Sequence, residues 1–170
     1  MKNFSIIAAI DKNNGIGKKN GLPWYLKKDM RHFAEITTGD GQNAVIMGSN
    51  TWRSLPEKYR PLPRRLNIVL SFEKMTDLPE GVLNFQSLEE ALADLKQKNI
   101  QEIFVIGGGQ IFAAAINHPN CAKLYLTEVA ADFDCDIFFP PIPPIFQKTA
   151  SQKDEDNGYQ LVFAIYEKIA

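Results

Sequence analysis

The sequence feature that most restricts the fold is a short apolar run, Ile103–Ile106, followed directly by Gly107-Gly108-Gly109 and then by the apolar segment Ile111–Ile116. The run is typical of a buried strand and the segment of a helix, with the glycines allowing a tight turn between them. This order of strand, turn and helix builds parallel sheets. Backbone N–H groups at such a turn can also approach a phosphate, and the spacing favours that interpretation over a purely structural turn.

Other segments continue the alternation of strands and helices. We expect further strands at Phe4–Ile10, Gln42–Met47, Leu66–Leu70, Lys123–Val129 and Tyr159–Tyr166. Helices are expected after Pro23-Trp24, at Gly48–Leu55 and from Ser87, where Glu90 completes a capping-box spacing. The chain is therefore predicted to be one α/β domain, residues 1–170, with a central, mostly parallel mixed sheet, helices on both faces and an antiparallel C-terminal edge strand.

The composition favours a small-molecule partner. The 19 Lys and Arg residues and 20 Asp and Glu residues give a formal charge of −1, so no strong field attracts nucleic acid or an anionic membrane. The early apolar run Ile6–Ile10 is closed by Asp11 and is too short for a signal peptide or a membrane span, so we expect a cytoplasmic protein. Cys121 and Cys135 have no metal-ligand spacing and are expected to be free thiols.

Asp29 is the most informative charged residue. Helical spacing places it between Phe33 and Ile36 on an apolar stripe, which Leu26 and Met30 extend. The carboxylate could simply stabilise the first turn through the helix dipole. Alternatively, it lies at the wall of an apolar pocket and accepts two parallel hydrogen bonds from an amidine-like N–H pair of a ligand. Both interpretations are open on these residues alone.

The remaining candidate groups are less specific. Arg65 follows Pro61-Leu62-Pro63 and could bind a carboxylate, although an arginine there is more often a surface residue. His32 lies on the polar helix face and His118 in a turn, so both are expected to be solvated and neither indicates a metal site or a catalytic dyad. The sequence contains no G-x-x-x-x-G-K-[ST] motif, and Gly15-Ile16-Gly17 does not complete G-x-G-x-x-G, which disfavours both common phosphate loops.

Ten short blocks in a fixed order resemble the dihydrofolate reductase family. They are Ile7-Ala8-Ala9, Gly15-Ile16-Gly17, Leu22-Pro23-Trp24, Asp29, Val45-Ile46-Met47-Gly48, Thr51-Trp52, Arg60-Pro61-Leu62-Pro63, Arg65, Val105-Ile106-Gly107-Gly108-Gly109 and Leu124-Tyr125-Leu126-Thr127. The match runs from Ser5 to about Pro140, with the usual terminal strand after it. The resemblance implies a monomeric oxidoreductase that uses NADPH to reduce dihydrofolate to tetrahydrofolate for one-carbon metabolism, and an antifolate target.

By this resemblance, Asp29 holds the pteridine through its 2-amino group and a ring nitrogen, with Thr127 as a partner of the carboxylate. Trp24 helps to hold water near Asp29, and Arg65 binds the α-carboxylate of the glutamate tail. Hydride passes to C6 of the ring while water protonates N5, and Asp29 tunes the ring electrostatically. The implied apolar lining of the substrate site is Ile7, Ala9, Leu22, Phe33, Leu55, Leu62, Ile106 and Phe112.

The loop Asp11–Trp24 resembles the active-site lid of the family, whose motion admits ligands and excludes water. Asp136 is expected to tether the lid near Gly17, although a solvated loop aspartate is the alternative.

The resemblance also implies an NADPH site and no metal. The expected cofactor residues are Ala9, Ile16, Gly17, Gly48, Ser49, Asn50, Thr51, Leu70, Ser71, Phe72, Ile106, Gly107, Gly108, Gly109, Gln110, Ile111 and Phe112. Relatives commonly bind the 2′-phosphate through basic residues where this chain has Ser49, Asn50, Phe72 and Gln110. Lys74 is one cation that could reach the site. We therefore expect NADPH to be preferred over NADH by a smaller margin than in such relatives.

Two other functions stay open. The first is a reductase of the same fold acting on another heterocycle, such as a riboflavin-pathway intermediate, which Leu22-Pro23-Trp24 together with Asp29 disfavours. The second is a non-catalytic pterin- or nucleotide-binding module, which is disfavoured because every expected catalytic position is occupied.

Overall fold

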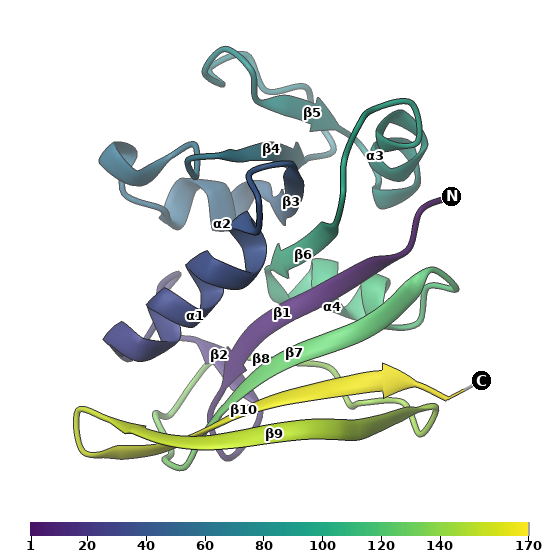
Figure 1. Cartoon of the computed structure of the whole chain (residues 1–170). Helices are drawn as coiled ribbons and strands as arrows, with labels where there is room; N and C mark the ends of the chain where they lie inside the picture. The colour runs from purple at the N-terminus through teal and green to yellow at the C-terminus, as the bar shows by residue number, and fades with distance from the viewer. Residues whose placement is uncertain (170) are drawn as a thin grey trace.

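The computed structural model describes residues 1–169, and their main element is a single mixed sheet (Figure 1). Its strands are β1 Phe4–Ile10, β3 Asn43–Gly48, β4 Arg65–Leu70, β5 Leu83–Phe85, β6 Ile103–Gly107, β7 Cys121–Val129, β9 Phe146–Asp156 and β10 Tyr159–Lys168. These eight strands stand in the order β5-β4-β3-β6-β1-β7-β10-β9. The expected α/β class and mixed sheet are confirmed.

Continuous apolar sequence explains the central strands. β3 is buried along its whole length, and β1, β4 and β6 are largely buried, as strands covered on both faces must be. β6 lies between β3 and β1 and runs parallel to both, with Val105 opposite Ile46 on one side and Ile6 on the other. The buried strand expected at Ile103–Ile106 is therefore confirmed, and it lies inside the sheet.

Helices cover both faces of this sheet. They are α1 Lys27–Thr38, α2 Ser49–Ser54, the 3-10 helix η1 Glu57–Tyr59, α3 Leu88–Leu95 and α4 Gly109–Ile116. Successive strand residues point to opposite faces. Accordingly, Ile46 belongs to the core covered by α3 and α4, and its neighbour Val45 to the core covered by α1 and α2. Among residues 1–169, no helix has the length and apolar character needed to cross a membrane.

The C-terminal edge of the sheet differs from the expectation. β10 pairs antiparallel with β7, with Phe163 opposite Thr127, as expected. However, β10 is not the edge strand, because β9 pairs along its other side. After Phe146, β9 is polar and exposed, so its sequence has no apolar face to signal a strand. The turn that joins the two strands uses Asn157 and Gly158 at positive φ, 52° and 81°.

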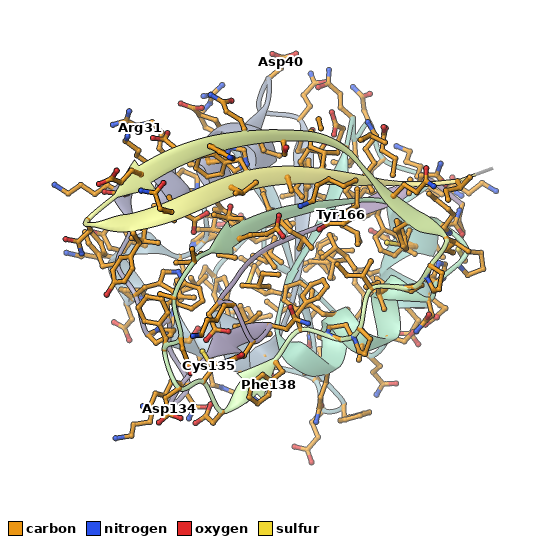
Figure 2. The ribbon with its side chains drawn as sticks, turned by 90° about the horizontal axis from the view of Figure 1, so that it is seen from below. Arg31, Asp40, Asp134, Cys135, Phe138 and Tyr166 are labelled. Atoms are coloured by element: carbon orange, nitrogen blue, oxygen red, sulfur yellow. The ribbon has the colours of Figure 1, made fainter. Side chains whose placement is uncertain are left out.

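A two-stranded sheet fastens the N-terminal loop to the segment after β7. It consists of β2 Gly15–Gly17 and β8 Ile137–Phe138, which pair antiparallel with Gly17 opposite Ile137. Figure 2 labels Asp134, Cys135 and Phe138 on the β8 side of this contact. The lid expected at Asp11–Trp24 thus has a fixed support in the described structure.

The capping box expected at Ser87 is confirmed. Ser87 caps α3 by accepting from the Glu90 backbone N–H over 3.2 Å, while Glu90 accepts from the backbone N–H of Gln86 over 3.0 Å. At α2 the N-cap residue is Gly48, the first residue of the segment Gly48–Leu55 that was expected to form this helix.

The expectation that both histidines are solvated is wrong. His32 is half-buried against Phe163, with ring centroids 4.2 Å apart. His118 packs on Phe4 at 5.5 Å and its Nδ1 accepts from the backbone N–H of Asn120 over 3.1 Å. Both rings therefore serve packing between elements that lie far apart in the sequence.

Candidate functional site

The carboxyl ends of four parallel strands meet at one edge of the sheet. Ile10, Gly48, Leu70 and Gly107 end β1, β3, β4 and β6, which are neighbours in the sheet. The chain runs outward from β1 through β3, β4 and β5 and then returns to place β6 beside β1. Ligands of α/β sheets bind outside the carboxyl ends of the strands at such a reversal. The loops that follow these strands are therefore the place to look for a site.

Asp29 lies in the first turn of α1 and is half-buried. The hydroxyl of Thr127, a 3 % exposed residue of β7, is hydrogen-bonded to its carboxylate. Burial raises the pKa of Asp29, the Thr127 hydrogen bond opposes that rise, and the negative charge of Asp156 adds to it. The pKa of Asp29 is raised on balance, because burial outweighs the Thr127 hydrogen bond. The Asp29 carboxylate can thus accept hydrogen bonds from a ligand beside a buried hydroxyl group.

The apolar stripe around Asp29 is narrower than expected. Leu26 is buried immediately before α1, and Phe33 and Ile36 pack against the core. Met30, in contrast, is 49 % exposed, so its place on the stripe is wrong. The cause is that Met30 lies about 100° around the helix from Asp29, at the margin of the stripe rather than within it.

Trp24 carries an unpartnered polar atom. The residue is buried in a cluster with Leu26, and its ring lies 5.0 Å from that of Phe133. Within residues 1–169, the buried Nε1 of Trp24 has no hydrogen-bond acceptor. A buried indole N–H requires an acceptor, and a bound water satisfies it where space allows. The nearby Leu22 is 63 % exposed and does not join this cluster.

Most of the expected apolar lining comes together in one cluster. Five of the eight residues pack in the core between the sheet and α1 with α2, namely Ile7, Phe33, Leu55, Leu62 and Ile106. Ala9 instead packs with the Trp24 cluster. Phe112 lies in the core on the α3 and α4 side, with its ring 5.2 Å from Phe139. The apolar cluster therefore extends from β1 and β6 to α1, without Phe112.

Arg65 is held in a defined orientation. Its Nε donates to the carbonyl of Pro63 over 2.8 Å and its Nη1 to the hydroxyl of Thr37 over 2.9 Å. Thr37 in turn donates to the carbonyl of Phe33 over 2.7 Å. A guanidinium has five N–H donors, so three are left for a carboxylate ligand. The half-buried Arg65 is thus fixed by α1 rather than being a free surface side chain.

The three glycines allow the loops after β3 and β6 to approach closely. A β-carbon on Gly107 or Gly108 would lie 3.2 Å from Thr51 Oγ1, and Gly107 has a φ of +140°. A β-carbon on Gly109 would lie 2.9 Å from Cγ2 of Ile137. Side chains at these positions would crowd Thr51 and Ile137, so the glycines let the end of β6 and the start of α4 pack closely against these two residues. The arrangement fits a bound pyrophosphate.

A hollow of about 360 Å³ lies where β3 and β4 end. Ser49 and Ser71 line it, because they directly follow the paired strand ends Gly48 and Leu70. The hydroxyl of Ser71 donates its proton to the carbonyl of Glu73 over 2.6 Å and accepts from Nδ2 of Asn84 over 2.9 Å, so Ser49 is the better placed of the two to donate to a cofactor phosphate.

The same hollow contains two cations. Arg53 and Lys74 line it, together with the carboxylates of Glu73 and Asp77. The expectation for Lys74 fits this placement, whereas Arg53 was missed. Arg53 lies four residues after Ser49 on α2 and therefore on the same helix face, which is a signal that the sequence contained.

Asp11 forms the base of the lid, a role that the sequence did not suggest. It is 3 % exposed and accepts backbone N–H groups of Gly15 over 2.7 Å, Asn13 over 2.9 Å and Phe133 over 3.1 Å. Burial alone would raise the pKa of Asp11, but these N–H donors together lower it below 3.8. A β-carbon on Gly15 would lie 2.4 Å from that of Cys135, so the turn requires glycine there.

Asp136 makes the contact expected of it. Its Oδ2 accepts the backbone N–H of Lys19 over 3.1 Å, and its own N–H donates to the carbonyl of Gly17 over 3.0 Å. The lid is therefore joined to β8 at two points beyond Asp11.

Neither cysteine is suited to nucleophilic chemistry. Both are free thiols, as expected, and burial raises the pKa of Cys121 to about 12 and that of Cys135 to about 11. In residues 1–169, no group of three or more His, Cys, Asp and Glu side chains is arranged to hold a metal ion.

Comparisons of the sequence with known proteins show which family the chain is similar to. A sequence model of the dihydrofolate reductase family matches residues 3–168. The chain is 41 % identical to a dihydrofolate reductase of Drosophila melanogaster over 99 % of both chains. It is 40 % identical to one of Heliothis virescens, over 98 % of this chain and 97 % of that relative. It is also 37 % identical to one of Aedes albopictus over 99 % of both chains.

Proposed function

Because this chain belongs to the dihydrofolate reductase family and reduces dihydrofolate with NADPH, we propose that Asp29 is the residue that binds and polarises the pteridine ring. The observation that carries this role is the half-buried carboxylate of Asp29 beside the buried hydroxyl of Thr127. A carboxylate in that setting can accept the parallel N–H pair of the pteridine 2-amino group and ring nitrogen. The N–H pair of an antifolate inhibitor would bind in the same way.

The reduction needs a proton at N5 as well as a hydride at C6. Asp29 accepts hydrogen bonds from the 2-amino group and its neighbouring ring nitrogen, and not from N5. It therefore acts by stabilising positive charge that develops on the pteridine. The unpartnered N–H of Trp24 supports a bound water in the same region, since it requires an acceptor. We assign the N5 proton to water that Trp24 helps to hold, and the orientation of Asp29 to Thr127.

The apolar cluster and Arg65 fit the remainder of the substrate. Ile7, Phe33, Leu55, Leu62 and Ile106 supply an apolar wall next to Asp29 for the ring and its linker. Arg65 has three N–H donors left for the α-carboxylate of the glutamate tail. We assign Ala9 and the exposed Leu22 to the substrate site in the state in which the lid is closed over a ligand. Phe112 is assigned to the cofactor site.

The residues at the strand ends fit NADPH, which supplies the hydride when bound. The backbone at Gly107, Gly108 and Gly109 and the hydroxyl of Thr51 would hold the pyrophosphate, because these glycines lie at the start of α4, where backbone N–H groups attract an anion. Further contacts to the nicotinamide and ribose parts are assigned to the residues expected from the sequence, Ala9, Ile16, Gly17, Gly48, Asn50, Leu70, Phe72, Ile106, Gln110, Ile111 and Phe112.

The hollow lined by Ser49 and Ser71 is the site that we assign to the adenosine 2′-phosphate. Arg53 and Lys74 supply positive charge there, and Glu73 and Asp77 offset it. A phosphate would thus meet the hydroxyl of Ser49 and a balanced set of charges rather than a cluster of cations. This supports the expectation that NADPH is preferred over NADH by a modest margin.

The deciding experiment follows the loss of nicotinamide absorbance when dihydrofolate is added to the enzyme with NADPH. We expect turnover that depends on dihydrofolate and that falls by about 100-fold or more in Asp29→Asn. Pterin binding without loss of absorbance would instead identify a non-catalytic module, and turnover with only another heterocycle would identify a different reductase. We also propose that the chain acts as a single-domain monomer, which sedimentation of the free enzyme tests.

A further inference from the structure

Helix α1 begins without a cap from its own sequence. The N-cap residue is Leu26 in an extended conformation, and its aliphatic side chain cannot accept a hydrogen bond. An N-cap side chain ordinarily accepts the backbone N–H of the second or third helical residue. Here, Lys28 is the second helical residue, and its N–H donates over 2.8 Å to Oδ2 of Asp156. The cap is therefore supplied by a residue 128 positions away.

A second bond holds the same two segments together. Lys28 Nζ lies 2.7 Å from Oδ1 of Asp154, which also accepts the backbone N–H of Glu155 over 2.7 Å. Asp156 is the last residue of β9 and pairs with Tyr159 across the turn. Figure 1 shows the turn between β9 and β10 at the start of α1. The edge hairpin thus holds the first turn of the helix through both backbone and side chain.

Asp29 is the residue next to this contact. The groups that face it are the hydroxyl of Thr127 from β7 and the carboxylate of Asp156 from the hairpin. The positive charge of Lys28 is paired with Asp154. On the next turn of α1, the half-buried His32 packs on Phe163 of β10, and burial lowers the pKa of the His32 ring. Asp156 is consequently the negative charge that acts on the Asp29 carboxyl group from outside its own helix.

We propose that Asp156 is a positioning residue for the reduction, which fixes the first turn of α1 through the Lys28 N–H and adds a negative charge near Asp29. The proposal rests on the role assigned to Asp29. Two consequences can be separated. The hydrogen bond sets where the Asp29 carboxyl group lies, and the charge sets the pH at which that group ionises, since a like charge disfavours ionisation.

Two substitutions divide these consequences. Asp156→Asn keeps an oxygen acceptor for Lys28 N–H but removes the charge, and Asp156→Ala removes both. Glu155→Gln is the matched control, because it removes a neighbouring negative charge on the same hairpin. The side chain of Glu155 accepts a hydrogen bond from Gln160 over 3.1 Å and not from α1. The first readout is the titration of the Asp29 carboxyl carbon by NMR in the ligand-free enzyme. The second is hydrogen exchange of the Lys28 amide, and the third is the pH profile of hydride transfer.

We expect the Asp29 titration and the pH profile to move to lower pH in both Asp156 variants and to stay in place in Glu155→Gln. Amide exchange at Lys28 should become about fivefold faster in Asp156→Ala, the loss typical of a helix cap, and be rescued in Asp156→Asn. Unchanged titration and exchange in the Asp156 variants, or an equal change in Glu155→Gln, would overturn the proposal. Because NMR titration and exchange do not need turnover, a failure of the assigned role of Asp29 would appear separately, as normal turnover in Asp29→Asn.

Discussion

Nη1 of Arg65 donates to the hydroxyl oxygen of Thr37 over 2.9 Å, so the arginine assigned to the substrate tail is anchored on the helix that carries Asp29. Thr37 lies two turns after Asp29, about 12 Å along a helix that rises 1.5 Å per residue. One rigid element therefore sets the spacing between the group that binds the ring and the group that binds the tail.

Arg65→Ala should weaken dihydrofolate much more than a pterin that lacks the glutamate tail. A bidentate contact between charged groups is typically worth about 1.5–3 kcal/mol, or about 10- to 150-fold in affinity. Dissociation constants for the two ligands measure the difference, with Arg64→Ala, an exposed neighbour, as the control. Thr37→Val should produce a smaller loss in the same direction, and equal losses for both ligands would remove Arg65 from the tail site.

Asp29→Asn should lower the rate of hydride transfer by about 100-fold or more, the usual cost of removing a preorganised electrostatic group. Folding should be unaffected or improved. Single-turnover kinetics compared with urea denaturation separate the two quantities. Asp40→Asn, an exposed position after the same helix, should change neither. A variant at Asp29 with near-normal rates would contradict the role.

The stability of the ligand-free enzyme should depend on pH through Asp29. Its pKa in the fold is raised above 3.8, so the folded protein binds this proton more tightly than the unfolded chain does. The resulting stability is present below pH 3.8 and is lost as pH rises through the folded pKa. We therefore expect Asp29→Asn, which does not titrate, to gain stability relative to the parent as pH rises from acid to neutral. Denaturant unfolding at several pH values measures this, and a constant difference would argue against a raised pKa.

The preference for NADPH over NADH should depend on Arg53 and Lys74. Each charge-assisted contact to the 2′-phosphate is worth about 1–3 kcal/mol of discrimination between the cofactors. Arg53→Ala and Lys74→Ala should therefore each reduce the ratio of kcat/KM for NADPH to kcat/KM for NADH. Ser49→Arg and Asp77→Asn should raise it, because they add positive or remove negative charge in the same hollow. Arg31→Ala, on the exposed face of α1 (Figure 2), is the control at fixed salt. A strong parental preference that none of these changes alters would place the phosphate elsewhere.

Asp11→Asn should destabilise the protein by about 1–3 kcal/mol, because the amide replaces a carboxylate that accepts three backbone N–H groups. The pKa of Asp11 is lowered, so the stability it adds is present above pH 3.8 and is lost as pH falls through the folded pKa. The gap between parent and variant should therefore close in strong acid. Asp134→Asn, whose side chain is 95 % exposed, should have little effect at any pH.

The sequence was most informative where burial alone decides structure. Phe4–Ile10 is a strand with the predicted bounds, and Ile103–Ile106 is central, because strands covered on both faces are apolar throughout. β9 could not be predicted in this way, since its stability comes from pairing with β10 rather than from an apolar face.

The site shows the same division. Asp29 was found because a charge on an apolar helix stripe conflicts with its surroundings. Asp156 was not found, because its contact with Lys28 exists only once the hairpin has folded back onto α1. Arg53 lay within reach of the sequence through its spacing from Ser49, but that helix is only six residues long and gave a weak periodic signal.

The polar character of β9 also bears on how this protein behaves at high concentration. An open sheet has two borders whose free backbone groups can recruit another chain and begin aggregation. One border here, β5, is only three residues long, and the other carries Lys148 and Lys153 among exposed polar side chains. Short length and charge are the two usual defences against such growth. Replacing these lysines with valine would leave the active centre untouched and yet make the enzyme prone to fibrous precipitation.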